Sequence, residues 1–106
     1  MLLDDELPKE IIERITSVSE PRKVILFGSA AIGELTPDSD IDLLIISDET
    51  ENLRNKRTTI ARNLCGLGHS FDVILISTEW FEESKNVVGG IAYPANKYGK
   101  VLYEAA

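Results

Sequence analysis

The chain has 106 residues, of which 43% are apolar, and it carries a formal net charge of -7. This length suits one hydrophobic core, so we expect residues 1–106 to form a single domain. The negative charge disfavours nucleic acid as a partner, and the lack of a long apolar run or signal peptide, with only Cys65 as cysteine, indicates a cytoplasmic protein without a membrane partner.

The N-terminal quarter predicts a helix followed by a strand. Apolar residues recur there at spacings of three and four, which is typical of the buried face of a helix: Leu7, Ile11, Ile12, Ile15 and Val18. Pro8 is placed to open this helix, and Pro21 follows its end. The short apolar run over residues 23–27 then predicts the first strand, which leads directly into Gly28 and Ser29.

Two carboxylates open the next predicted strand, which covers about residues 40–46. Side chains of a strand alternate between faces, so Asp40 and Asp42 point the same way, about 7 Å apart along the strand. Neighbouring carboxylates repel each other unless a cation lies between them. All-oxygen ligation with open positions suits Mg2+ that also binds substrate phosphates.

The Gly-Ser turn before this strand is suited to bind the phosphates. If residues 29–33 form a short helical turn, Ser29 and the following backbone N–H groups present unpaired donors to an anion. The turn and the Asp pair therefore indicate a nucleoside triphosphate bound together with Mg2+.

Three other glycine or aspartate motifs fit less well. Gly28 and Gly33 have the glycine spacing of a P-loop, but Glu34 stands where the phosphate-binding Lys is required. A calcium loop is disfavoured because Leu43 occupies the position that needs Gly for a sharp turn. The dinucleotide-binding pattern is absent, since Ala30 stands at its second glycine.

The middle of the chain predicts a second helix over residues 51–67. Its inward positions are apolar: Leu53, Ile60, Ala61 and Leu64. Its outward positions are mainly cationic, and they form either a solvated face or a contact for a partner or nucleotide: Arg54, Lys56, Arg57 and Arg62. Glycines end this helix, and His69 in the following loop is interpreted as a bystander.

A third strand is predicted over residues 71–76, with Asp72 on the same face as Ile74 and Ile76. A buried, unpaired acid would cost stability, so we expect Asp72 to have a cation partner.

The C-terminal quarter predicts two helices and a last strand. Thr78 can cap a helix that extends to about Val88, and Trp80 and Phe81 are expected to anchor it. A short helix opened by Pro94 and a strand over residues 101–103 complete the chain.

The run of Gly28-Ser29, ten intervening residues and Asp40-Ile41-Asp42 resembles the motif of the DNA polymerase beta nucleotidyltransferase superfamily. The short chain is similar to the minimal nucleotidyltransferase branch of that superfamily over about residues 23–104. The resemblance implies an α/β fold with a small mixed sheet and flanking helices. In this fold the first two strands are antiparallel, and the third lies beside the second.

The resemblance also implies a chemistry. A nucleoside monophosphate, AMP from ATP, would be transferred to a hydroxyl acceptor with the help of two Mg2+ ions. The residues that would hold the metal and carry catalysis are Asp40, Asp42 and Asp72. Those that would bind the nucleotide are Gly28, Ser29, Gly33 and Ser39.

Larger relatives use an added domain to hold the base or the acceptor, and we expect no residues of this chain to be left for one. Either a partner protein completes the site, or the acceptor is itself a protein. The resemblance implies a helical HEPN-domain partner in a toxin–antitoxin arrangement, in which this chain is the antitoxin and adenylylates its partner. A homodimer is the simplest rival. We expect helices to cover one sheet face, leaving apolar area on the aspartate-bearing face for the partner.

Two other functions remain open. The branch often carries arginines where this chain has Ala30 and Ile32, so the chain could be a weak or inactive member that acts as a binding module by contact. A small-molecule nucleotidyltransferase of the aminoglycoside-modifying type is the second alternative.

Overall fold

The computed structural model describes residues 6–28, 40–49, 51–90 and 92–105. The elements in chain order are α1 (Glu6–Thr16), β1 (Lys23–Phe27), β2 (Ile41–Ser47), α2 (Leu53–Asn63), β3 (Phe71–Ser77), α3 (Thr78–Ser84), α4 (Ala92–Tyr98) and β4 (Lys100–Glu104). None of the helices in these residues has the length and apolar character needed to cross a membrane.

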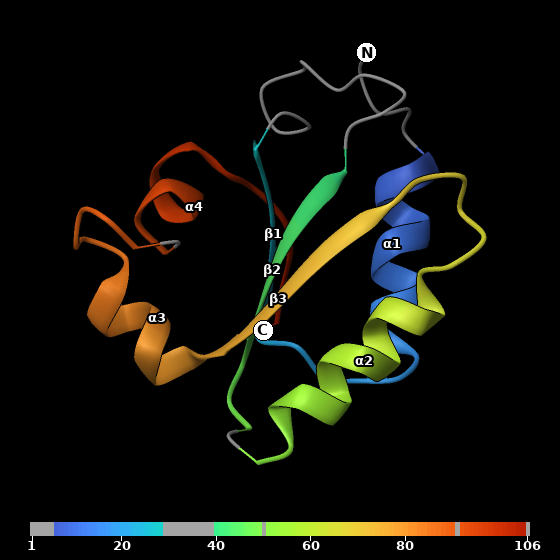
Figure 1. Ribbon diagram of the computed structural model, residues 1–106, viewed down its shortest axis with the longest axis horizontal. Coiled ribbons are helices and arrows are strands. Elements are labelled where there is room, and N and C mark those ends of the chain that lie inside the picture. Colours follow the sequence, from blue (N-terminus) through green and yellow to red (C-terminus); the bar gives the residue numbers. More distant parts are fainter. Residues whose placement is uncertain (1–5, 29–39, 50, 91, 106) are drawn as a thin grey trace.

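Four strands form one mixed sheet in the order β3-β2-β1-β4 (Figure 1). β1 is antiparallel to both β2 and β4, whereas β2 and β3 are parallel. Parallel neighbours need a crossover connection, and α2 supplies it. The expected α/β fold and the arrangement of the first three strands are therefore confirmed, while the place of β4 beside β1 is an addition to the prediction.

Alternate residues of the strands bury two separate apolar clusters, one on each face of the sheet. The larger cluster joins the sheet to α1 and α2, and its buried members are Leu7, Ile11, Ile15, Val24, Leu26, Ile41, Leu43, Ile45, Ile60, Leu64 and Val73. The smaller joins it to α3 and α4 through Ile25, Leu44, Ile46, Phe81, Ala92 and Ala95. Burying one large aliphatic side chain contributes about 1.5–3 kcal/mol, so the larger cluster contributes more of the stability.

The expectation of an open apolar area on the aspartate-bearing face is wrong. Leu44 and Ile46 lie on that face and are almost fully buried. The side chain of Phe81 from α3 and the small residues of α4 cover them. The chain therefore uses its own C-terminal helices where we expected a partner.

Helix ends differ from the prediction because local backbone conformation decides them. α2 begins at Leu53, after Asn52 with a left-handed φ of 56°, and ends at Asn63. Val18 lies beyond the end of α1 and is 41% exposed. α4 begins at Ala92, two residues before Pro94, which is tolerated because the first turn of a helix does not use its N–H groups internally.

The start of α3 corrects two further expectations. Ser77, and not Thr78, caps this helix, because the Ser77 hydroxyl accepts a hydrogen bond of 3.1 Å from the Trp80 N–H. The Thr78 hydroxyl instead donates to Asp48 Oδ1 at 2.6 Å. Of the two expected aromatic anchors, Phe81 is buried but Trp80 is 43% exposed. α3 also ends at Ser84, short of Val88.

Packing of α4 against β1 depends on the absence of a side chain at Gly99. A Cβ at Gly99 would overlap the Ala95 carbonyl oxygen and press on the Ile25 side chain, whereas a Cβ at Gly90 would meet nothing within 4 Å. Gly99→Ala should lower the free energy of unfolding by about 1–3 kcal/mol, the usual cost of overpacking. Urea denaturation measures this change. Gly90→Ala is the control, and an equal effect of both substitutions would contradict the packing argument.

Candidate active site

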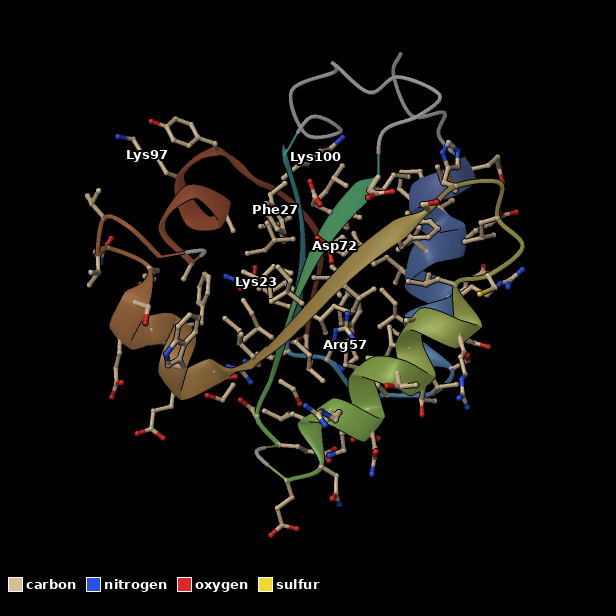
Figure 2. All side chains as sticks on the ribbon, viewed as in Figure 1. Lys23, Phe27, Arg57, Asp72, Lys97 and Lys100 are labelled. Carbon is tan, nitrogen blue, oxygen red and sulfur yellow. The ribbon has the colours of Figure 1, made fainter. Side chains whose placement is uncertain are left out.

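The parallel pairing of β2 with β3 brings two of the predicted aspartates together. Asp42 and Asp72 are partners in the register, so their side chains lie on the same face of adjacent strands, which are about 4.8 Å apart. Asp42 is half-buried, Asp72 is exposed, and Asp40 is exposed just before β2 begins. Figure 2 labels Asp72 and Phe27, the cross-strand partner of Asp42 on β1, toward the same end of the sheet.

The electrostatics of this end of the sheet are unfavourable to a charged Asp42. Burial raises the pKa of the Asp42 carboxyl above its ordinary value, and the negative charges of Asp72 and Asp40 raise the pKa further. Like charges therefore converge on one carboxylate. A cation placed among them would remove this penalty.

Gly28 is the residue that makes room for the Asp42 carboxylate. Its φ of +72° is left-handed, which disfavours any residue with a side chain. In addition, a Cβ built at this position would overlap Oδ2 of Asp42. A glycine is thus required here both for backbone conformation and for close approach to the carboxylate.

Among the described residues, the expected cation partner of Asp72 is not found. The ion pairs among the described residues all lie elsewhere: Arg22 with Asp48, Lys23 with Glu104, Lys56 with Glu49, and Lys85 with Glu82. Asp72 tolerates this because it is exposed and keeps its hydration. The expectation assumed a buried carboxylate and is wrong for that reason.

Within the described ranges, no group of three or more His, Cys, Asp or Glu side chains converges as a complete metal site. A divalent ion that is held by one or two carboxylates and completed by phosphates and water does not need such a group, and Mg2+ is usually bound in this way. An ion of that kind fits this site, because Asp42 and Asp72 lie side by side on one sheet face and the pKa of Asp42 is raised.

Several residues of interest lie outside the described residues. These are the predicted nucleotide-binding Ser29, Gly33 and Ser39, and the two positions without arginine, Ala30 and Ile32. Their roles stay predictions.

Sequence reasoning missed the role of one cation of α2. Arg57 was expected to point outward, but its Nε donates a hydrogen bond of 2.7 Å to the Val73 carbonyl of β3. The only signal in the sequence was its position beside the inward residues of α2. Lys56 likewise pairs with Glu49, so the cationic face of this helix is not uniformly solvated.

The chain belongs to the nucleotidyltransferase domain family, whose sequence profile matches residues 8–93. This range contains Gly28 and the strands that carry Asp42 and Asp72. The chain is therefore a nucleotidyltransferase by class, and the resemblance seen in its motif is confirmed. No curated protein matches it.

Two solved structures share the fold. One is a chain from the crystal structure of a toxin–antitoxin with AMP-PNP, with a TM-score of 0.73 and 21% identity over 93% of this chain and 74% of that one. The other is a candidate nucleotidyltransferase from Sulfolobus solfataricus, with a TM-score of 0.62 and 22% identity over 93% of this chain and 78% of that one. The likeness supports the polymerase beta-like nucleotidyltransferase fold.

Repulsion at Asp42 predicts a pH-dependent gain in stability on substitution. Because folding raises the pKa of Asp42, the folded chain binds this proton more tightly than the unfolded chain. The stability that comes from proton binding is lost as the pH rises through the raised pKa. In metal-free buffer, the Asp42→Asn variant should therefore have a larger free energy of unfolding than wild type at about pH 7. The difference should be smaller below about pH 4.

Urea denaturation across this pH range measures the effect. Glu83→Gln is the control, because Glu83 is exposed on α3 and removing its charge leaves the aspartates unchanged. A gain for Asp42→Asn that stayed constant with pH would contradict the electrostatic explanation.

Proposed function

We propose that the chain transfers AMP from ATP to a hydroxyl group of a partner protein, as the antitoxin of a HEPN-type toxin. The observation that carries the proposal is the register pair of Asp42 and Asp72 beside Gly28, in a chain of the nucleotidyltransferase family. A partner protein and an adenine nucleotide are supported by a structural neighbour described as a toxin–antitoxin with AMP-PNP.

Three aspartates have roles in this reaction. Asp40 and Asp42 would hold Mg2+ with the triphosphate, and Asp72 would help to hold a second ion and to orient the acceptor hydroxyl. The acceptor hydroxyl oxygen would attack the α-phosphorus in line and expel pyrophosphate, and the bound ions would stabilise the attacking and leaving oxygens. The open side of Asp72, an exposed carboxylate, leaves space for an acceptor.

Gly28 supports the same site from the backbone. Because Gly28 has no side chain, the Asp42 carboxylate can lie against the backbone at the end of β1, just before the predicted Gly-Ser turn. That turn would supply Ser29, Gly33 and Ser39 to the phosphates.

Metal-dependent nucleotide binding is the first test of this proposal. With Mg2+ and ATP at about 100 times its Kd, wild type should gain about 2.7 kcal/mol of stability. Asp42→Asn and Asp72→Asn should lose most of this gain, because each removes one of the charges that attract the ion. Thermal melts with and without Mg2+ and ATP measure it, and Glu83→Gln should behave as wild type.

Transfer to the acceptor is the second measurement. The purified chain is incubated with ATP, Mg2+ and the product of the adjacent gene, and mass spectrometry of both chains should find one AMP group on the partner. If the partner binds wild type and Asp42→Asn equally and neither modifies it, the chain is a contact module. Full activity of a stable monomer on an aminoglycoside, without any partner, would favour the small-molecule alternative.

A further inference from the structure

β3 is an edge strand, and its outward backbone groups can be identified from the register. The Ile41 N–H donates to the Ser70 carbonyl at 2.8 Å, and Ile41 pairs with Phe71 in the parallel ladder. In a parallel pair, the N–H and C=O of alternate residues face the neighbouring strand. Asp72, Ile74 and Ile76 therefore direct their backbone groups toward β2.

The odd-numbered residues of β3 consequently direct their N–H and C=O groups away from the sheet. Arg57 occupies one of these outward groups, the Val73 carbonyl. Leu75 lies two residues further along the strand, and in the described part of the chain its outward N–H and C=O have no backbone partner. Such a pair of groups is a template for an additional strand.

The helix beside this edge is basic, although the protein as a whole is acidic. α2 contains four cationic residues and no acidic one. Only one of them, Lys56, has an ion-pair partner among the described residues. Figure 2 shows Arg57 between α2 and β3. Its Nε donates to the Val73 carbonyl of β3, and its terminal nitrogens have no partner among the described residues.

Helix geometry places a second cation on the same side. Arg54 precedes Arg57 by three residues, so the two are neighbours on the surface of α2. Arg54 is exposed and carries no ion pair within the described ranges. Arg62 follows Arg57 by five residues and points to a different side of the helix.

We propose that the β3 edge binds an extended acidic segment of a partner protein, which pairs with the backbone of Leu75 and places carboxylates against Arg54 and Arg57. Main-chain hydrogen bonds in such a complex supply affinity, and charge complementarity selects the partner. A second copy of this chain fits less well, because each of its two edge strands offers a single acidic residue, Asp72 on β3 and Glu104 on β4. The proposal does not rest on nucleotidyl transfer, since no nucleotide takes part in it.

A synthetic ten-residue peptide that alternates Glu and Val is a suitable probe, with a Lys and Val peptide as its charge control. Hydrogen exchange of the full chain, followed by NMR, should show slower exchange of the Leu75 amide when the acidic peptide is added. The Ile74 amide, which already bonds to β2, should change little. Equal binding of the basic peptide, or the same protection of Leu75 without peptide as protein concentration rises, would overturn the proposal.

Matched arginine variants test the location. Arg54→Gln should weaken binding of the acidic peptide about tenfold, because it removes one charge-assisted contact. Arg62→Gln removes the same charge from the same helix and should leave the affinity within about twofold. Equal losses in both variants would show a non-specific charge effect and overturn the assignment to this edge, as would a lack of binding to wild type. Asp42→Asn should bind the peptide as wild type does, which separates this result from a failure of the proposed enzymatic function.

Discussion

The parallel register of β2 with β3 is the constraint on which the candidate site depends. It places Asp42 directly beside Asp72, and it does so with side chains that repel each other. A shift of one residue would move one of these carboxylates to the opposite face, because strand side chains alternate. The buried residues of β2 hold the register, since each of Leu43, Leu44 and Ile45 has a fixed face in one of the two apolar clusters.

Along β2, the residue of the candidate site and the residues that stabilise the fold occupy different parts of the strand. β2 begins at the buried Ile41, carries the half-buried carboxylate of Asp42 next, and continues through five residues that are buried on both faces. The unfavourable charge is therefore located where the strand enters the sheet, and the apolar interior of the strand offsets its cost. At the far end, the buried Ser47 accepts a hydrogen bond from the Glu49 N–H at 3.1 Å, so the strand ends with its polar group paired.

Sequence patterns predicted much of the fold, and physical reasons explain the rest. The strands were recognisable because short apolar runs follow turn residues, and the motif connected β1 to β2. Helix ends and the cap at Ser77 were missed because they depend on backbone conformation and on competition between adjacent hydroxyls. The closure of the aspartate-bearing face was missed because small residues such as Ala92 and Ala95 give little periodic signal, although they allow close packing. The residues of the candidate site stay a prediction, although the register unites Asp42 with Asp72.

The two edge strands of the sheet, β4 and β3, have different surroundings, and only β3 carries a residue of the candidate site. β4 extends the sheet beside β1 with residues beyond the matched range of the family, and it is held in part by Lys23 and Glu104. β3 instead keeps its outer edge next to a basic helix, where a single guanidinium covers one carbonyl. Because β3 also carries Asp72, any chain that pairs with its edge would lie within a few residues of the proposed acceptor position. One strand can therefore bind a partner through its edge and orient an acceptor through a carboxylate. The odd-numbered residues of β3 direct their backbone groups outward, while the backbone of Asp72 stays paired with β2.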